Sequence, residues 1–377
     1  MSTPPPAPTR HGPRAPVIPA QFRRFRASPS FPRTRESRAA PAATTWVPAC
    51  AGTTTEGVVG QCPTLATRRS APGRGKDGEP RTASFGPPVP SGAWLLEVRF
   101  VVIASRFGDI TRFDLARTIL GRGRYWTTAY LVDGLMVDSG CRHTAPELAR
   151  LLGDAKVTHL VNTHTHEDHI GGNEAVLRAN PTAEATAHPL ALRVLRDPRR
   201  EQPLHPYRHV MWGMPRPSEA RAAADGETIQ TAHHRFQVVF TPGHSDDHLC
   251  LIEPDAGWAF TGDLFVGGRD RALRVGGDAW AIVASLRRIA ALGPTLLLPG
   301  AARVRAEAVP ALLEKAAYLE ELGGRIVAMH RQGRSEAEIV RAACGGPMLI
   351  ELITLGHFSR RGLVRSFLRR EPRPDSR

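Results

Sequence analysis

The segment from His164 to His169, which reads HTHEDH, limits what this chain of 377 residues can fold into more than any other part. It follows a short apolar run over residues 157–162, typical of a buried strand, and it precedes two glycines and a segment that favours a helix up to Ala179. Imidazole and carboxylate groups together suit zinc or iron. The sequence therefore predicts a metal site on a strand-to-helix loop.

The spacing inside this segment brings its side chains to one cavity from two directions. In an extended chain His164 and His166 point to the same side, because alternate residues share a face. Asp168 and His169 enter the following helix and approach the cavity from another side. Such an arrangement has enough ligands for two adjacent metal ions.

The central region alternates short strands with helices. Apolar and β-branched runs predict strands over residues 98–103, 236–240, 248–252, 258–261 and 295–298, and a hairpin over 127–138 that turns at Asp133-Gly134. Thr144 and Glu147 have the spacing of a capping box for a helix through Leu152, and residues 278–292 have a helical apolar period. This order predicts an α/β sandwich.

Residues 304–370 favour a helical extension to this domain. Apolar residues from Val309 to Ala317 share one helix face, Gly323-Gly324 is expected to end that helix, and Ser335 with Glu338 predicts the cap of another. A structural brace on the catalytic domain is favoured over a separate function for this extension.

The first 95 residues differ in composition from the rest. They contain seventeen of the 33 prolines, thirteen Lys or Arg and only four Asp or Glu, without apolar periodicity. Such a segment buries too little surface to offset its conformational entropy, so disorder is predicted here and in a short tail over residues 371–377. Residues 30–54 resemble a translated bacterial intergenic repeat, so the segment is either a genuine disordered tail or a spurious extension of a protein that starts near Val98 or Val102.

The formal net charge of +14 comes entirely from the two ends of the chain, since residues 96–359 are neutral overall. We therefore expect no basic binding face for nucleic acid. We expect a small-molecule substrate instead. No apolar run reaches the length that spans a bilayer, and the five cysteines have no paired spacing. We expect a cytoplasmic protein without a membrane partner; the sequence leaves its oligomeric state open.

The cluster resembles the metallo-β-lactamase superfamily, whose signature HxHxDH is matched in full. The resemblance runs from about Val98 to Arg303, within a catalytic domain expected over residues 96–303. It includes a strand ending in Asp138, a TPGH turn at 241–244 and a TGD strand end at 261–263. It implies an αββα sandwich of the hydroxyacylglutathione hydrolase type. It also implies a first metal site of His164, His166 and His244 and a second with Asp168 and His169, bridged by Asp263.

One position departs from the family pattern. The family usually supplies a last second-site ligand from a Pro-Gly-His turn, whereas this chain has Pro299-Gly300-Ala301. The expectation is one tightly bound zinc and a second, weaker one, with iron as the other candidate. His357 is the candidate substitute ligand, although an ordinary structural role is the favoured interpretation of that residue.

A metal-dependent hydrolase acting on a small ester, thioester or lactam is the function that the resemblance implies. Asp168 is the candidate general base, because it lies where it can orient a water and accept its proton. Two alternatives stay open: an iron enzyme similar to persulfide dioxygenases, which needs only the first site, and a catalytically inert or nucleic-acid-binding member of the fold. The pocket is expected to be lined by residues 197–224, which include Tyr207 and Trp212.

Overall fold

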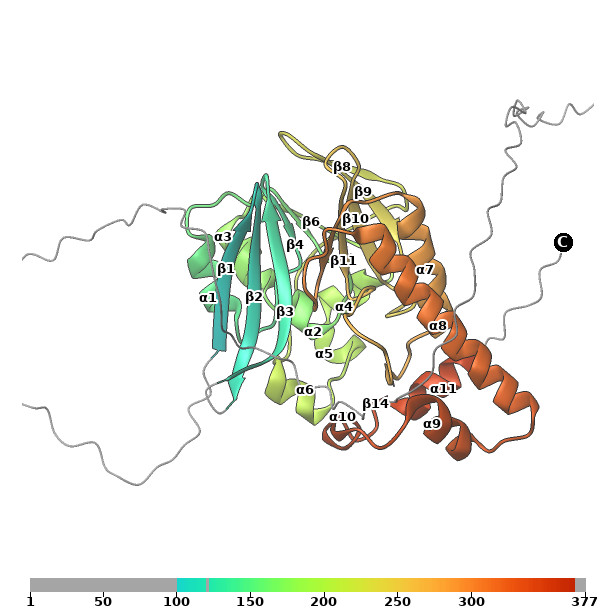
Figure 1. Cartoon of the computed structure of the whole chain (residues 1–377). Coiled ribbons are helices and arrows are strands. Elements are labelled where there is room, and N and C mark those ends of the chain that lie inside the picture. Colours follow the sequence, from blue (N-terminus) through green and yellow to red (C-terminus); the bar gives the residue numbers. More distant parts are fainter. Residues whose placement is uncertain (1–99, 120–121, 370–377) are drawn as a thin grey trace, which may run out of the picture. The chain divides into compact units, whose positions relative to one another are not determined.

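The fold was obtained as a computed structural model that describes residues 100–119 and 122–369 (Figure 1). The disorder predicted for residues 1–95 and 371–377 lies outside the described residues. Within them the strands form two large sheets and one small sheet. The helices are α1 Ala145–Leu152, α2 Glu167–Ile170, α3 Asn173–Ala179, α4 Ala191–Arg196, α5 Pro198–Glu201, α6 Pro206–Met211, α7 Ala279–Ala291, α8 Ala308–Arg331, α9 Glu336–Cys344, α10 Leu349–Ile353 and α11 Arg360–Arg369.

The first sheet follows the order of the chain. Strands β1 to β4 are antiparallel, and β4 to β7 are parallel because helices connect them. Its strands are β1 Phe100–Phe107, β2 Ile110–Ile119, β3 Arg122–Val132, β4 Leu135–Val137, β5 His159–Val161, β6 Glu184–Ala187 and β7 Arg221–Ala222.

The second sheet has the order β13-β11-β10-β9-β8 and is antiparallel except where β11 pairs with β13. A small sheet joins β12 to β14. These strands are β8 Thr228–Gln230, β9 Arg235–Phe240, β10 Leu249–Glu253, β11 Trp258–Gly262, β12 Leu273–Arg274, β13 Leu296–Pro299 and β14 Phe358–Ser359.

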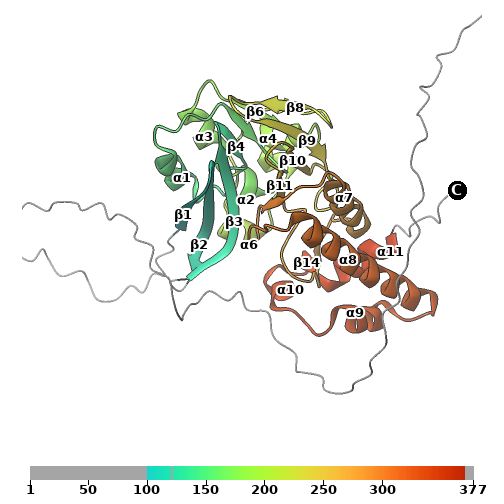
Figure 2. The same cartoon turned by 45° about the horizontal axis from the view of Figure 1, so that its top comes forward.

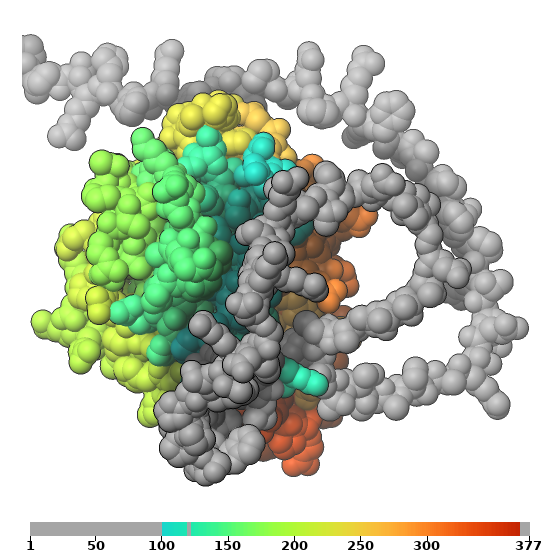
Figure 3. All heavy atoms as spheres, turned by 90° about the vertical axis from the view of Figure 1, so that its left-hand side faces the viewer, coloured from blue at the N-terminus to red at the C-terminus, as the bar shows by residue number. Residues whose placement is uncertain are grey.

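The two large sheets pack face to face and helices cover their outer faces. Val137, Leu251 and Phe260 belong to the core between the sheets. Because alternate side chains of a strand point to opposite faces, Met136 lies in another core, with Leu148 of α1, on the outer side of the first sheet. Figure 3 shows that side in space-filling form, and Figure 2 shows the layers from above. The predicted αββα sandwich is confirmed.

Helix α7 lies on the outer face of the second sheet and α8 packs against α7, while α9 and α11 of the extension pack against α8. Ile252, Leu286, Leu312 and Phe367 belong to one hydrophobic cluster, so the extension and the sandwich share a core. The predicted capping box of α9 is present, with Ser335 and Glu338 bonded reciprocally. Among the described residues, every helix is too short or too polar to cross a bilayer.

Two local predictions were wrong. Thr144 does not cap α1 with its side chain, because its backbone is already helical (φ −90°, ψ −9°) and its hydroxyl donates instead to the carbonyl oxygen of Cys141 at 3.1 Å. Glu147 pairs with Arg150 at 2.6 Å. The helix expected to end at Gly323-Gly324 continues to Arg331, since close packing rather than a turn explains the first glycine.

Gly323 and Gly324 provide a matched test of this packing. A Cβ on Gly323 would lie 2.7 Å from the Phe367 ring and 2.8 Å from the Trp280 ring, whereas a Cβ on Gly324 would meet nothing within 4 Å. We expect Gly323→Ala to lower the free energy of unfolding by about 1–3 kcal/mol. Gly324→Ala should raise it by about 0.5–1 kcal/mol, because alanine favours the helix. Urea unfolding measures both, and equal effects of the two substitutions would contradict the packing.

Candidate metal centre

The predicted ligands lie at strand ends from both sheets, at one edge of the sandwich. His164 and His166 follow β5, and Asp168 and His169 lie in the short helix α2 that comes next. His244 lies in the turn after β9, and Asp263 directly follows β11. Because the strands end at the same edge, residues about 100 positions apart meet there.

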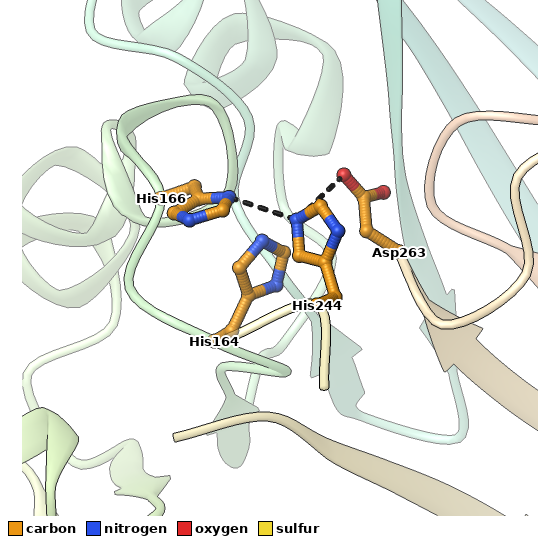
Figure 4. A group of neighbouring side chains, drawn as sticks. All are labelled: His164, His166, His244 and Asp263. Carbon is orange, nitrogen blue, oxygen red and sulfur yellow. Dashed lines mark hydrogen bonds and ion pairs between the residues drawn. The ribbon is translucent and has the colours of Figure 1, made fainter. Parts of the chain in front are cut away.

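Four of these residues form a compact group in which each offers one ligand atom, and all four atoms lie within 4.8 Å of one another. The group consists of His164, His166, His244 and Asp263 (Figure 4). Nε2 of His244 lies 3.0 Å from Nδ1 of His166 and 3.5 Å from Oδ2 of Asp263. The side chains therefore converge on one point.

The polar atoms of this group fit a metal ion. Nε2 of His164 and Oδ1 of Asp263 are buried without a hydrogen-bond partner in the part of the chain that the structure describes. Burial, followed by neighbouring positive charge, lowers the pKa of His164 and His166 well below the usual value and that of His244 to about 4. Neutral imidazole is the form that binds metal, and three imidazoles with one carboxylate suit zinc or iron.

A second set of groups lies beside the first. Nε2 of His169 is also buried without a partner among the described residues, 3.4 Å from Oδ1 of Asp263 and 3.9 Å from Oδ2 of Asp168. Although burial lowers the pKa of His169, the carboxylates of Asp263, Asp138 and Asp168 raise it well above its usual value. This concentration of negative charge favours a cation at the position between them.

The turn at Pro299-Gly300-Ala301 contacts this second set. A Cβ on Gly300 would lie 2.9 Å from Cε1 of His169 and 3.1 Å from Oδ1 of Asp263. The turn is therefore where the resemblance placed it, and it ends in a methyl group instead of a ligand. The candidate substitute His357 has other partners: its Nδ1 lies 2.9 Å from the Tyr207 hydroxyl, and its Nε2 lies 3.5 Å from Nε of Arg274.

Three buried side chains hold the ligand loops, and their roles were not predicted from the sequence. Asp138 accepts from Nδ1 of His169 at 2.7 Å, which orients that ring, and from the backbone of Thr163. Asp247 accepts from the backbone and hydroxyl of Thr165. Nε2 of His248 accepts from the backbone N–H of Asp263 at 3.2 Å. Such outer partners fix the geometry of metal ligands.

Comparison with known proteins agrees with this geometry. Residues 123–301 match the family model of the metallo-beta-lactamase superfamily. Over 182 residues the chain is 30% identical to thioesterase pkgB of Emericella nidulans, which covers 46% of this chain and 45% of that protein. Over 137 residues it is 35% identical to a hydroxyacylglutathione hydrolase of Maricaulis maris, with 36% and 44% covered. The chain thus spans about half the length of the curated relatives it matches.

Among solved structures, a metallo-beta-lactamase family protein of Thermus thermophilus aligns with 73% of this chain and 92% of its own, at 19% identity and a TM-score of 0.46. The family model covers strands β4 to β13, the HxHxDH segment, His244 and Asp263. Residues 123–301 therefore form a domain of the metallo-β-lactamase superfamily.

Proposed function

We propose that this protein is a metal-dependent hydrolase of thioesters. The observation that carries the proposal is the convergence of His164, His166, His244 and Asp263 at one point, with unpartnered ligand atoms facing it. Relatives named as a thioesterase and as a hydroxyacylglutathione hydrolase support the thioester bond as the substrate class. Residues 96–303 would carry the chemistry, and residues 304–370 would brace them.

When bound at this group, a divalent ion such as zinc supplies a Lewis acid and lowers the pKa of water toward neutrality. The role proposed for Asp168 is that of general base, because its carboxylate belongs to the second ligand set, with Oδ2 3.9 Å from Nε2 of His169. It would orient the attacking water and accept its proton. Asp138 and Asp247 would keep the ligand loops in place during the reaction.

The proposed location is a reducing compartment such as the cytoplasm. Cys141, Cys250 and Cys344 are buried free thiols in the described part of the chain, as such a compartment favours.

A screen of purified, metal-loaded protein tests the proposed function. We expect zinc by elemental analysis and release of thiol from small thioesters, with little action on phosphoesters. A second candidate is an iron enzyme similar to persulfide dioxygenases, which the ligand-free Ala301 turn favours because that chemistry needs only the first site. Iron in the purified protein together with oxygen consumption on a persulfide would decide for that candidate.

The turn at Ala301 leads to a prediction about metal content. We expect close to one tightly bound metal per chain after dialysis, because the second ion would be held by Asp168, His169 and Asp263 alone. Ala301→His should raise the tightly bound count toward two, while Ala302→His, one position along, should not. Elemental analysis measures the count.

Two tightly bound equivalents in the unmodified protein would contradict this prediction. His357→Ala would then be the deciding variant, since loss of one equivalent would assign the missing ligand to the extension. Retention of both equivalents would show that the second site uses other residues.

A further inference from the structure

Arg274 of strand β12 is half-buried and has no counter-ion of its own among the described residues. Its Nη1 is buried and has no hydrogen-bond partner among residues 100–119 and 122–369. The carboxylates that act on it electrostatically are those of Glu167 and Asp168. Glu167 is already paired with Arg208, and Asp168 belongs to the proposed metal centre. Burying a charge without a partner costs free energy of folding. An arginine in this position therefore indicates that it binds an anion.

Arg274 acts on the metal ligands themselves. After burial, its positive charge is the largest contribution that lowers the pKa of His166, and it also lowers the pKa of His164 and His244. Burial lowers the pKa of Arg274 to about 10, so it stays protonated at neutral pH. The residue thus carries a fixed positive charge that acts on these ligands.

Two other segments of the chain meet at Arg274. Strand β12 pairs with β14, which brings His357 of the extension next to it, and Nε of Arg274 donates to Nε2 of His357 at 3.5 Å. The His357 ring stacks on His205 with centroids 4.1 Å apart, and its Nδ1 lies 2.9 Å from the Tyr207 hydroxyl. Four side chains from three parts of the chain therefore lie side by side: His205 and Tyr207 at the start of α6, Arg274 of β12 and His357 of the extension.

The direction of these hydrogen bonds leaves a second donor free. Arginine can only donate, so Nε2 of His357 accepts and the single proton of the neutral ring lies on Nδ1. Burial, followed by Arg274, lowers the pKa of His357 to about 4, which keeps the ring neutral. Nδ1 then donates to the oxygen of Tyr207, and the Tyr207 hydroxyl proton is free to donate elsewhere.

We propose that Arg274 and Tyr207 bind an anionic group of the thioester substrate, a carboxylate carried on its acyl half or on its thiol half, and that His357 positions both donors. The inference rests on the proposed function and narrows its substrate class. A guanidinium and a hydroxyl together match the oxygens of a carboxylate, and a charge-assisted hydrogen bond is strongest where water is excluded. The bound anion would also supply the missing counter-ion.

Three thioesters of similar size test the proposal on the zinc-loaded protein. S-butanoyl-N-acetylcysteamine is neutral, S-succinyl-N-acetylcysteamine has a carboxylate on the acyl half, and S-butanoyl-3-mercaptopropionate has one on the thiol half. We expect the wild-type kcat/KM to be about 10- to 100-fold higher for one carboxylate substrate than for the neutral one. The preferred compound identifies which half carries the anion.

Arg274→Gln should remove this preference through KM, with a loss of kcat/KM about 10- to 100-fold larger on the preferred substrate than on the neutral one. Arg287→Gln, which breaks an exposed pair with Glu320, is the matched control and should leave all three rates unchanged. Equal wild-type rates on the three substrates, or an equal loss on all of them in Arg274→Gln, would overturn the proposal.

Two further readouts do not depend on turnover. Succinate should raise the Tm of the zinc-loaded wild type more than that of Arg274→Gln, and butanamide should raise neither. Arg274→Gln should itself keep or raise the Tm, because it removes an unpaired buried charge. If no thioester is hydrolysed, the proposed function fails, while the succinate result still decides whether Arg274 binds carboxylate.

His357 requires a test of its own as a positioning residue. His357→Ala should raise KM for the preferred carboxylate substrate more than KM for the neutral substrate, and should change KM more than kcat. His357→Gln, whose side-chain oxygen can accept from Arg274, should recover part of the loss. A fall in kcat on all substrates would show that His357 acts on the reaction itself.

Discussion

Replacing His166 or His244 by alanine should lower kcat/KM for thioester hydrolysis by a factor on the order of 10³ or more while the chain stays folded. Each ring contributes one nitrogen to the group whose ligand atoms lie within 4.8 Å of one another. The lowered pKa values of both rings, caused first by burial, mean that the folded protein already holds them in the neutral, ligand-ready form. Removing one ring leaves too few ligands for tight binding.

Three measurements check this result together: turnover, bound metal by elemental analysis, and the far-UV circular dichroism spectrum. His330→Ala is the control, because His330 lies near the end of α8, away from the ligand loops. It should behave as wild type in all three. Near wild-type turnover in His166→Ala or His244→Ala would remove the basis for the first metal site.

Replacing Arg208 by methionine should lower the free energy of unfolding by about 3–5 kcal/mol, the largest stability effect that we expect from a single change. Arg208 and Glu167 form a buried ion pair, with 5% and 0% of their side chains exposed, that joins α6 to α2. Methionine fills most of the space of arginine but leaves the Glu167 carboxylate buried without its partner. Glu167 lies between His166 and Asp168 in the chain, so its unpartnered carboxylate would distort the loop that holds these two residues.

The double variant Glu167→Gln, Arg208→Met should recover a large part of this loss, because no buried charge remains. The loss in free energy of unfolding caused by Arg208→Met alone should also be smaller at low pH. Burial raises the pKa of Glu167 even beside Arg208, so the folded state keeps its proton to higher pH than the unfolded state. Stability linked to that proton is present in acid and lost as the pH rises.

Urea unfolding of the four proteins of this cycle at pH 5 and pH 8 measures these effects. Arg208→Met should be closer to wild type at pH 5 than at pH 8. A loss below about 1 kcal/mol at both pH values would show that Glu167 reaches solvent when its partner is removed, and that the pair does not hold α6 in place.

The sandwich and the residues that converge at the proposed metal centre could be predicted from the sequence because both depend on local patterns. The HxHxDH segment is contiguous, and the strand before it has a clear apolar run. His244 and Asp263 follow apolar strands and lie beside glycines that permit sharp turns, since Gly243 and Gly262 both have positive φ. Each feature can be recognised within a few residues of sequence.

Other features could not be predicted because they depend on contacts between distant segments. Gly323 resembles a helix end until Phe367 and Trp280 are placed against it. Arg274 lies in a two-residue strand and shows no local signal; its setting depends on pairing with β14, far along the chain. His357 was considered as a substitute ligand because an apolar, strand-like run leads to it, with a structural role as the favoured interpretation; the structure gives it Tyr207 and Arg274 as partners.

The most direct test of a metal-dependent thioester hydrolase is to remove the metal from wild-type protein and restore it in steps. The chelated protein should release no thiol from S-butanoyl-N-acetylcysteamine or from the two carboxylate thioesters above the rate of the buffer. Activity should return in proportion to added zinc and reach most of its maximum near one equivalent per chain. Full turnover by the metal-free protein, or no turnover of any of these thioesters at any metal loading, would contradict the proposed function.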